Sequence, residues 1–350
     1  MPVLSGKLGE WTVPNLHSWK DRKNAFVFDP DPIIQSDSKI ATIGSCFASE
    51  LASAMTRLNL AGAMHPAGLF YNTKSILQEF ERIFEGKDLS TKLELWKTKK
   101  GYVHPLKAFR HVHDSEQELR NWSNDIDEQA NQLFRPANVI VITLGLIEAW
   151  KTSDTNVYLP HIPHPDVFED LAPVMTRLTV QDMLEDLEAI RSLIQKHTTA
   201  SLVVTVSPIP LHSTFTAKDV RVANTESKSR IRAAVSEFLD AHDDVRYFHS
   251  YEMVMTAERL SDFMLEDGRH VHRRAVDYIL QQFLLRYAEK SLHPAIDEPD
   301  WLTAPSKTDT RPAPTNPRSR FIAKARSILP DVLEERVVQL SKEIRKSVKS

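Results

Sequence analysis

Short apolar runs separated by amphipathic helical patterns constrain the fold of this chain more than any other feature. Two runs are strongly apolar, Val139–Leu144 and Leu202–Val206, and a third covers Ile40–Ile43. Runs of this kind, without polar alternation, are typical of strands that are buried on both faces of a parallel sheet. Two weaker strands are expected at Ala61–Met64 and Arg246–Phe248.

Helical patterns fill the intervals between these runs. The expected helices are Phe47–Leu58, Ser75–Phe84, Glu116–Leu133, Val180–His197, Ser227–Ala241 and Arg273–Arg286. Alternating strands and helices predict a doubly wound α/β domain, whose ligands bind beyond the carboxyl ends of the strands. Gly44-Ser45, Gly145 and Ser207-Pro208 each follow a predicted strand, so we expect them to meet at one edge of the sheet.

The chain of 350 residues divides into four predicted segments. A main domain is expected over 38–296, after an N-terminal extension over 1–37. Pro, Thr and Ser are frequent in 297–317, which predicts a flexible linker. The basic segment 318–350 carries an apolar stripe typical of an amphipathic helix. We expect its helix at 331–348 to dock on its own domain or a second subunit, with a protein partner or membrane surface as the alternative.

Composition excludes several classes of function. The formal net charge is −3, which gives no electrostatic argument for nucleic acid. Cys46 is the only cysteine, so an intramolecular disulfide and a cysteine-cluster metal site are excluded. Residues 1–31 lack an apolar core of signal-peptide length, and no segment reaches the ~18 apolar residues that span a bilayer. We therefore expect a cytoplasmic protein, and nothing predicts a cofactor.

Ser45 lies on a glycine-preceded turn between a predicted strand and a predicted helix. Acyl-transfer enzymes place a nucleophile at such turns, because the helix start supplies N–H groups and a positive dipole end that suit an oxyanion. The alternative is that Ser45 only caps the helix. Its neighbour Cys46 is expected to point away from the site, into strand–helix packing.

Asp267 and His270 could complete a catalytic triad with Ser45. Serine is a poor nucleophile until a base removes its proton, and that base is usually a histidine oriented by a carboxylate. The turn Asp267-Gly268-Arg269-His270 can place the carboxylate against one ring nitrogen while the other faces the serine. His272 is the rival base, but it lies five residues from Asp267. We predict His270 as the base.

Two pairs of histidines invite a metal hypothesis. His111 and His113 form one pair, and His161 and His164 form the other. Neither pair has the spacing of a zinc motif, and both fall in predicted loops. We therefore expect no metal site.

The turn around Ser45 also carries a family resemblance. Gly44-Ser45-Cys46-Phe47-Ala48 resembles the naming motif of the GSCFA family, which is similar to a branch of the SGNH (GDSL-like) hydrolase superfamily. The resemblance covers roughly residues 38–290. Further matching segments are His65–Asn72, Thr143–Trp150, Val206–Pro208, Ser227–Ser229 and Ser250–Glu252. It implies a flavodoxin-like, mostly parallel sheet of five strands with helices on both faces.

The resemblance implies a role for each site residue. Ser45 would be the nucleophile and would donate its own N–H to the oxyanion, and Gly68 would donate a second N–H. Asp267 and His270 would be the orienting carboxylate and the general base. The turn that begins at Gly145 corresponds to the block that usually supplies an asparagine donor.

Ile147 stands at the position of that asparagine. Either Asn72 or another polar group replaces the missing donor, or the oxyanion hole is weaker. Glu148 is expected to hydrogen-bond an active-site backbone or a substrate hydroxyl, or else to form a structural ion pair.

The function that these residues predict is an SGNH-type serine acyl enzyme. It would cleave or transfer a small acyl group through an acyl-Ser45 intermediate, and the resemblance to the SGNH superfamily implies acetyl on a carbohydrate as the leading class. Hydrolysis and O-acetyl transfer use the same triad, and the sequence does not separate them. The expected partner is a small-molecule or carbohydrate ester. The alternative is a catalytically weak SGNH-like module that binds a glycan or a protein.

Overall fold

The computed structural model describes residues 30–57, 60–107, 111–256, 263–265, 271 and 273–293. The predicted linker over 297–317 and the predicted helix over 318–350 lie outside the described residues, as do residues 1–29 of the expected N-terminal extension.

Five parallel strands form the central sheet. They are β1 (Lys39–Gly44), β2 (Ala61–Met64), β5 (Val139–Leu144), β9 (Ser201–Val206) and β10 (Val245–Phe248). Their spatial order is β2-β1-β5-β9-β10, and all four pairings are parallel. This is the flavodoxin-like order, which confirms the expected fold class. The order reverses between β1 and β5, and such a switch point is where open α/β sheets bind ligands.

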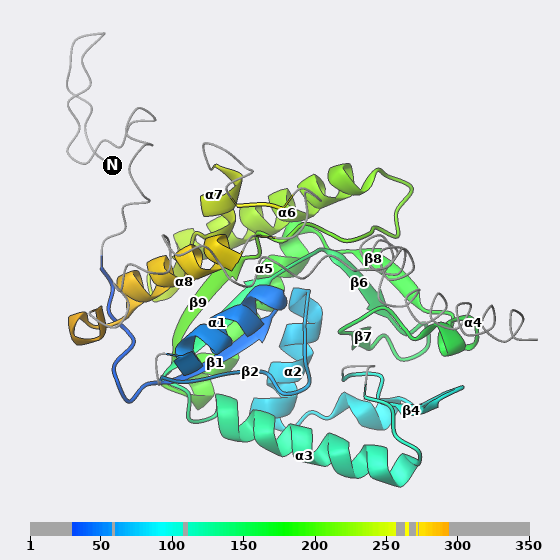
Figure 1. Ribbon diagram of the computed structural model, residues 1–350. Helices are drawn as coiled ribbons and strands as arrows, with labels where there is room; N and C mark the ends of the chain where they lie inside the picture. The colour runs from blue at the N-terminus through cyan, green and yellow to red at the C-terminus, as the bar shows by residue number, and fades with distance from the viewer. Residues whose placement is uncertain are drawn as a thin grey trace, which may run out of the picture.

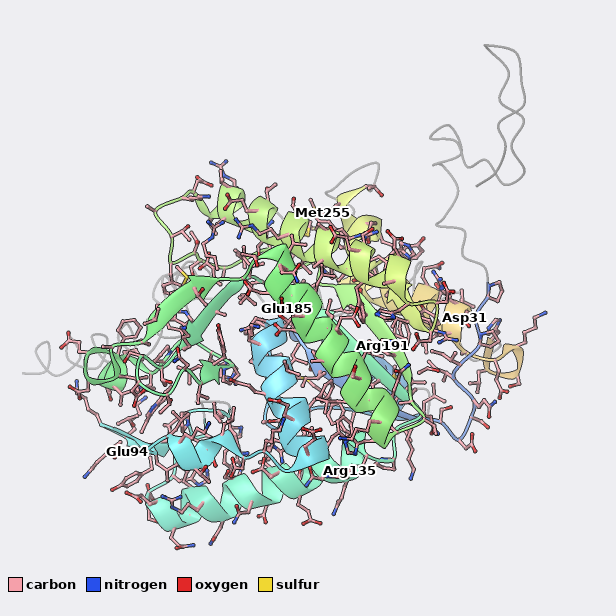
Figure 2. All side chains as sticks on the ribbon, turned by 180° about the vertical axis from the view of Figure 1, so that it is seen from behind. Asp31, Glu94, Arg135, Glu185, Arg191 and Met255 are labelled. Carbon is pink, nitrogen blue, oxygen red and sulfur yellow. The ribbon has the colours of Figure 1, made fainter. Side chains whose placement is uncertain are left out.

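Helices cover both faces of the sheet because side chains alternate along each strand. One face carries Ile43 and Ile142 in a core with four helices, and the other carries Ile40 and Val141 in a second core. The first face is covered by α2 (Thr73–Glu85), α3 (Glu116–Phe134), α5 (Val180–His197) and α6 (Val220–Ala241). Figure 2 shows this side, where Arg191 of α5 pairs with Asp244 before β10.

The second face is covered by α1 (Cys46–Arg57), α7 (Ser250–Met255) and α8 (Arg273–Tyr287). Helices α1 and α8 lie side by side in Figure 1 and contact each other. The amides of Ile33 and Ile34, just before β1, both donate to the Tyr287 carbonyl oxygen at 2.8 Å. The end of α8 therefore lies near the amino edge of the sheet, and α8 begins near the carboxyl edge.

Two small antiparallel sheets were not expected from the sequence. One pairs β3 (Trp96–Thr98) with β4 (Gly101–Val103), and the other joins β6 (Glu148–Lys151), β7 (Tyr158–Leu159) and β8 (Val174–Arg177). These strands have two to four residues each, and most of their residues are half-exposed or exposed, so they have no apolar run that would signal them. The remaining short helices are η2 (Leu89–Lys92), η3 (Pro165–Val167), α4 (Phe168–Leu171) and η5 (Lys290–Leu292).

Membrane-spanning helices are absent from the described residues: none of their helices is long and apolar enough to cross a bilayer.

Candidate functional site

The turn after β1 holds Ser45 in a fixed and unusual position. Gly44 has a φ of +136°, and a Cβ there would lie 2.1 Å from the Thr143 carbonyl oxygen. Only glycine allows β1 to turn this close to β5. Ser45 itself is 3% exposed, and its Oγ makes no hydrogen bond to any described residue.

The lack of a hydrogen bond at Ser45 Oγ excludes the alternative that Ser45 only caps the helix. A capping serine accepts a hydrogen bond from the first turn of its helix, and Ser45 Oγ accepts none there. A buried polar group without a partner costs about 1–3 kcal/mol, so each one calls for an explanation. A hydroxyl kept ready for a reaction is such an explanation.

Cys46 corrects an expectation from the sequence. We expected its side chain to pack between strand and helix, but it is exposed. Residues three or four apart share a face of a helix, and the face of α1 that packs on the sheet carries Phe47, Leu51 and Met55. Cys46 lies off that face.

The segment after β2 runs beside the Ser45 turn. The His65 amide donates to the Thr42 carbonyl oxygen at 2.8 Å, and the Phe70 amide donates to the Gly44 carbonyl oxygen at 2.9 Å. These two bonds hold the loop that carries Gly68, whose φ is +104°. Gly68 is therefore brought to the same edge as Ser45.

His65 fixes the shape of this loop from inside the protein. It is 2% exposed, its Nδ1 accepts from the Ala67 amide at 3.1 Å, and its Nε2 lies 2.8 Å from Glu79 Oε1. Because Nδ1 accepts, Nε2 carries the proton and donates to Glu79. Burial disfavours the Glu79 carboxylate, but His65 and Arg82 outweigh it and lower the pKa of Glu79.

Gly145 brings the turn after β5 against Ser45. A Cβ on Gly145 would lie 3.5 Å from the Ser45 Cβ and 3.2 Å from the Tyr71 ring. The amides of Gly145 and Leu146 both donate to the Tyr71 carbonyl oxygen, at 3.0 and 3.2 Å. The Ser207 amide, after β9, donates to the Leu144 carbonyl oxygen at 2.8 Å. The predicted meeting of the three turns at one sheet edge is confirmed.

Both amides expected to bind an oxyanion are engaged in the structure. Ser45 N–H donates to the Thr143 carbonyl oxygen at 3.0 Å, and Gly68 N–H donates to the His65 carbonyl oxygen at 3.1 Å. The Ile147 side chain is buried and apolar, so it supplies no donor. A further donor to the oxyanion must therefore come from a polar side chain.

Asn72 carries a polar side chain beside the segment that holds the Gly145 turn. It is 3% exposed and follows Tyr71 directly. Its Oδ1 accepts from the Ser75 amide at 2.9 Å and caps α2, which fixes the orientation of the amide group. Its Nδ2 makes no hydrogen bond to any described residue and stays available as a donor.

Glu148 does not belong to the group around Ser45. Its Oε2 accepts from the Phe215 amide at 2.9 Å, and its Oε1 accepts from the Thr214 hydroxyl. It forms no ion pair with a described residue. Glu148 instead ties the start of β6 to the loop between β9 and α6.

Asp267 and His270 lie outside the described residues, so their distances to Ser45 are not part of the site geometry. The residues that flank them are described. Met264 and Val271 form an isolated antiparallel bridge, and Met264 is buried in the core shared with α1 and α8.

Lys228 is a buried residue near the site for which sequence reasoning assigned no role. It lies on α6, is 1% exposed, and its Nζ donates to the Gly145 carbonyl oxygen at 2.8 Å. Its neighbour Ser227 accepts at Oγ from the Ile147 amide at 3.0 Å. Lysine in an amphipathic helix is normally exposed, so the sequence pattern gave no signal for this burial.

The described residues contain no cluster of three or more His, Cys, Asp or Glu that could hold a metal ion. A model described as the GSCFA family matches residues 39–283, a span that includes the whole central sheet and the three turns around Ser45. No curated protein matches the chain.

Proposed function

The chain belongs to the GSCFA family, and we propose that it is a serine-dependent acyl enzyme of the SGNH type. The single observation that carries the proposal is the buried, unpartnered Ser45 Oγ at the switch point of the sheet. Neither helix capping nor any other hydrogen bond among the described residues accounts for this hydroxyl. A nucleophile accounts for both its position and its lack of a partner.

The proposed reaction has two steps. Ser45 Oγ attacks the ester carbonyl carbon while His270 takes the serine proton, and the leaving alcohol then departs with that proton. The resulting acyl-Ser45 is attacked by water or by a sugar hydroxyl, whose proton passes to His270 and back to Ser45. Asp267 would keep the imidazole of His270 in the tautomer that accepts the serine proton.

The position of α8 supports the roles of Asp267 and His270. A helix of 15 residues is about 22 Å long, and a strand of six residues is about 20 Å long. Helix α8 ends beside residues 33–34 near the amino edge, so it begins at about the level where β1 ends at Gly44. The bridge between Met264 and Val271 leads the chain into that helix start.

The proposed substrate is an ester of a small acyl group, with acetyl esters of carbohydrates as the leading class. This choice rests on analogy with the SGNH superfamily and not on a geometric feature. Hydrolysis and O-acetyl transfer require the same residues and differ only in the acceptor.

A fluorophosphonate probe tests the proposal directly, because it labels activated serines covalently. The full-length protein should be labelled, Ser45→Ala should abolish labelling, and Cys46→Ala should not. Cys46 is exposed and adjacent to Ser45, so it is the matched control for non-specific reaction. Absence of labelling, under conditions in which a known serine esterase reacts, would overturn the proposal.

A second candidate function is a catalytically weak module that binds a glycan or a protein. The observation that favours it is the engagement of both expected oxyanion amides, those of Ser45 and Gly68, with backbone carbonyl groups. Such a module would bind ligand but would leave Ser45 unlabelled. The probe experiment therefore separates the two candidates.

Hydrolase and transferase are separated by p-nitrophenyl acetate turnover with and without sugar acceptors. A transferase should release p-nitrophenol faster when the acceptor is present and should yield an acetylated sugar. A hydrolase should show a rate that does not depend on the sugar and should yield acetate.

A further inference from the structure

The amino group of Lys228 is buried without a carboxylate partner. It contacts the turn of residues 145–147, which packs against Ser45. Its Nζ donates to the Gly145 carbonyl oxygen, and it makes no salt bridge with a described residue. Lysine is almost never fully buried unless it is paired, because burying a charge is costly. The protein therefore tolerates a cost at this position that a neutral apolar side chain would avoid.

The contact links Lys228 to the candidate site through one turn. Residues 145–147 are held on one side by Tyr71, whose carbonyl oxygen accepts from Gly145 and Leu146. They are held on the other side by α6, where Ser227 accepts from Ile147 and Lys228 donates to Gly145. The position of the turn against Ser45 thus depends on both contacts.

A chain of peptide groups leads from Lys228 to Asn72. The ammonium donates to the carbonyl of the Gly145–Leu146 peptide, and the N–H of that same peptide donates to the Tyr71 carbonyl oxygen. Tyr71 and Asn72 share the next peptide group. Hydrogen bonds in such a chain polarise and strengthen one another in a low-dielectric interior.

We propose that Lys228 is a positioning residue for the reaction at Ser45. Its ammonium holds the Gly145 carbonyl, and through this bond it fixes both the turn against Ser45 and the segment that orients Asn72. This inference rests on the proposed serine chemistry.

Turnover of p-nitrophenyl acetate by full-length variants tests the proposal. Lys228→Met keeps the length of the side chain and removes the charge and the donor. We expect kcat to fall by roughly 10- to 100-fold, because a small displacement of the turn misplaces the reacting groups. KM should change by less than about threefold, since Lys228 does not touch the substrate. Lys228→Arg, which keeps a charged donor, should retain more activity than Lys228→Met.

Lys107→Met is the matched control. Lys107 is also buried, but it pairs with Asp127, and its hydrogen bonds to described residues go to Asp127 and His104 rather than to the three turns around Ser45. After its loss Asp127 still pairs with Arg82 at 3.1 Å. Its kcat should stay within about twofold of the wild type, which separates the loss of a particular lysine from the loss of any buried lysine.

Each outcome decides the question. A folded Lys228→Met with wild-type kcat would overturn the positioning role, as would an Arg variant no more active than the Met variant. The proposal also requires the neutral variants to fold, so loss of the folded state in both Lys228→Met and Lys228→Gln would overturn it. If the wild type shows no turnover that depends on Ser45, the proposed function itself fails, and the lysine inference fails with it.

Discussion

The backbone amide of Ser45 donates to the carbonyl oxygen of Thr143 at 3.0 Å. This bond continues the pairing of β1 with β5 by one residue beyond Gly44, whose register partner is Thr143. It anchors the nucleophile turn to the sheet, and it occupies the amide that an SGNH-type mechanism would use for the oxyanion. Stabilisation of that charge must then draw on other donors, and we predict that Asn72 Nδ2 is one of them.

Asn72→Asp tests this assignment without disturbing the helix cap. Aspartate keeps the oxygen that accepts from Ser75 at the start of α2, and it caps helices as well as asparagine does. It replaces the donor Nδ2 by a carboxylate oxygen. We expect kcat to fall by roughly 10²- to 10³-fold, with the melting temperature within a few degrees of the wild type.

Asn72→Ala is the complementary variant. It removes the donor and the cap together, so it should lose similar activity and also about 1 kcal/mol of stability. Chemical denaturation and steady-state kinetics on both variants separate the two roles. Full activity in Asn72→Asp would show that Nδ2 does not bind the oxyanion.

The burial of Lys228 leads us to predict an unusual dependence of stability on pH. Burial lowers the pKa of Lys228 to about 7, and no charged side chain contributes. In the unfolded chain a lysine titrates near 10.4, so between about pH 7 and 10.4 the unfolded state binds more protons than the folded state. The contribution of Lys228 to the free energy of unfolding therefore rises with pH in that window, by up to about 1.4 kcal/mol per pH unit.

Urea denaturation of the wild type and Lys228→Met from pH 6 to 10 measures this effect as a difference. The variant should be at least as stable as the wild type at pH 6, and its advantage should shrink as the pH rises towards 10. Other titrating groups are common to both proteins and cancel. A difference that does not change with pH would mean that Lys228 keeps an ordinary pKa in the folded state.

The sequence predicted the parts of this fold that are set by long apolar patterns. β5 and helix α5 match the expected residues without change, because Val139–Leu144 is a continuous apolar run and Val180–His197 carries an apolar stripe of helical period. β2 also matches, although its pattern is weaker. α6 begins at Val220 rather than at Ser227, since Ala223 is the one buried residue in its first two turns, which therefore have no apolar stripe. The short strands β6 to β8 form because they pair with one another, and no local sequence pattern indicates that pairing.

The candidate site was predictable where it depends on topology and was not where it depends on side-chain burial. Ser45, Gly68 and Gly145 meet because parallel strands end at one edge. The engagement of the Ser45 amide and the burial of Lys228 follow from the close approach of particular turns. Cys46 shows the same limit: its exposure depends on the rotation of α1 about its axis, which one residue at a helix start does not reveal.

Glu148 predicts a local effect on the loop between β9 and α6. Replacing it by glutamine removes the charge and keeps one acceptor oxygen, so the Phe215 contact loses its charge assistance and the Thr214 hydroxyl must turn to accept from the amide nitrogen. Hydrogen bonds to charged groups contribute about 1.5–3 kcal/mol, and we expect a loss near the lower end. Limited proteolysis should cut Glu148→Gln within residues 209–218 faster than the wild type.

Thr214→Val is the control for that prediction, because it removes the hydroxyl contact and leaves the Phe215 amide bonded to Glu148. A double-mutant cycle of the two changes measures their coupling. Equal cleavage rates in the wild type and Glu148→Gln would show that the loop is held by other contacts.

Gly44 and Gly86 give the sharpest test of the Ser45 turn, since both have positive φ and differ in their surroundings. A Cβ at Gly44 would lie 2.1 Å from the Thr143 carbonyl oxygen, whereas a Cβ at Gly86 would meet nothing within 4 Å. Gly86→Ala should therefore lose only about 1–2 kcal/mol, the cost of the left-handed backbone. Gly44→Ala adds a backbone clash and should lose more than about 4 kcal/mol or fail to fold. Urea denaturation of both variants measures the two losses in the free energy of unfolding. Equal losses would mean that the backbone at Gly44 can shift away from β5 without an extra cost.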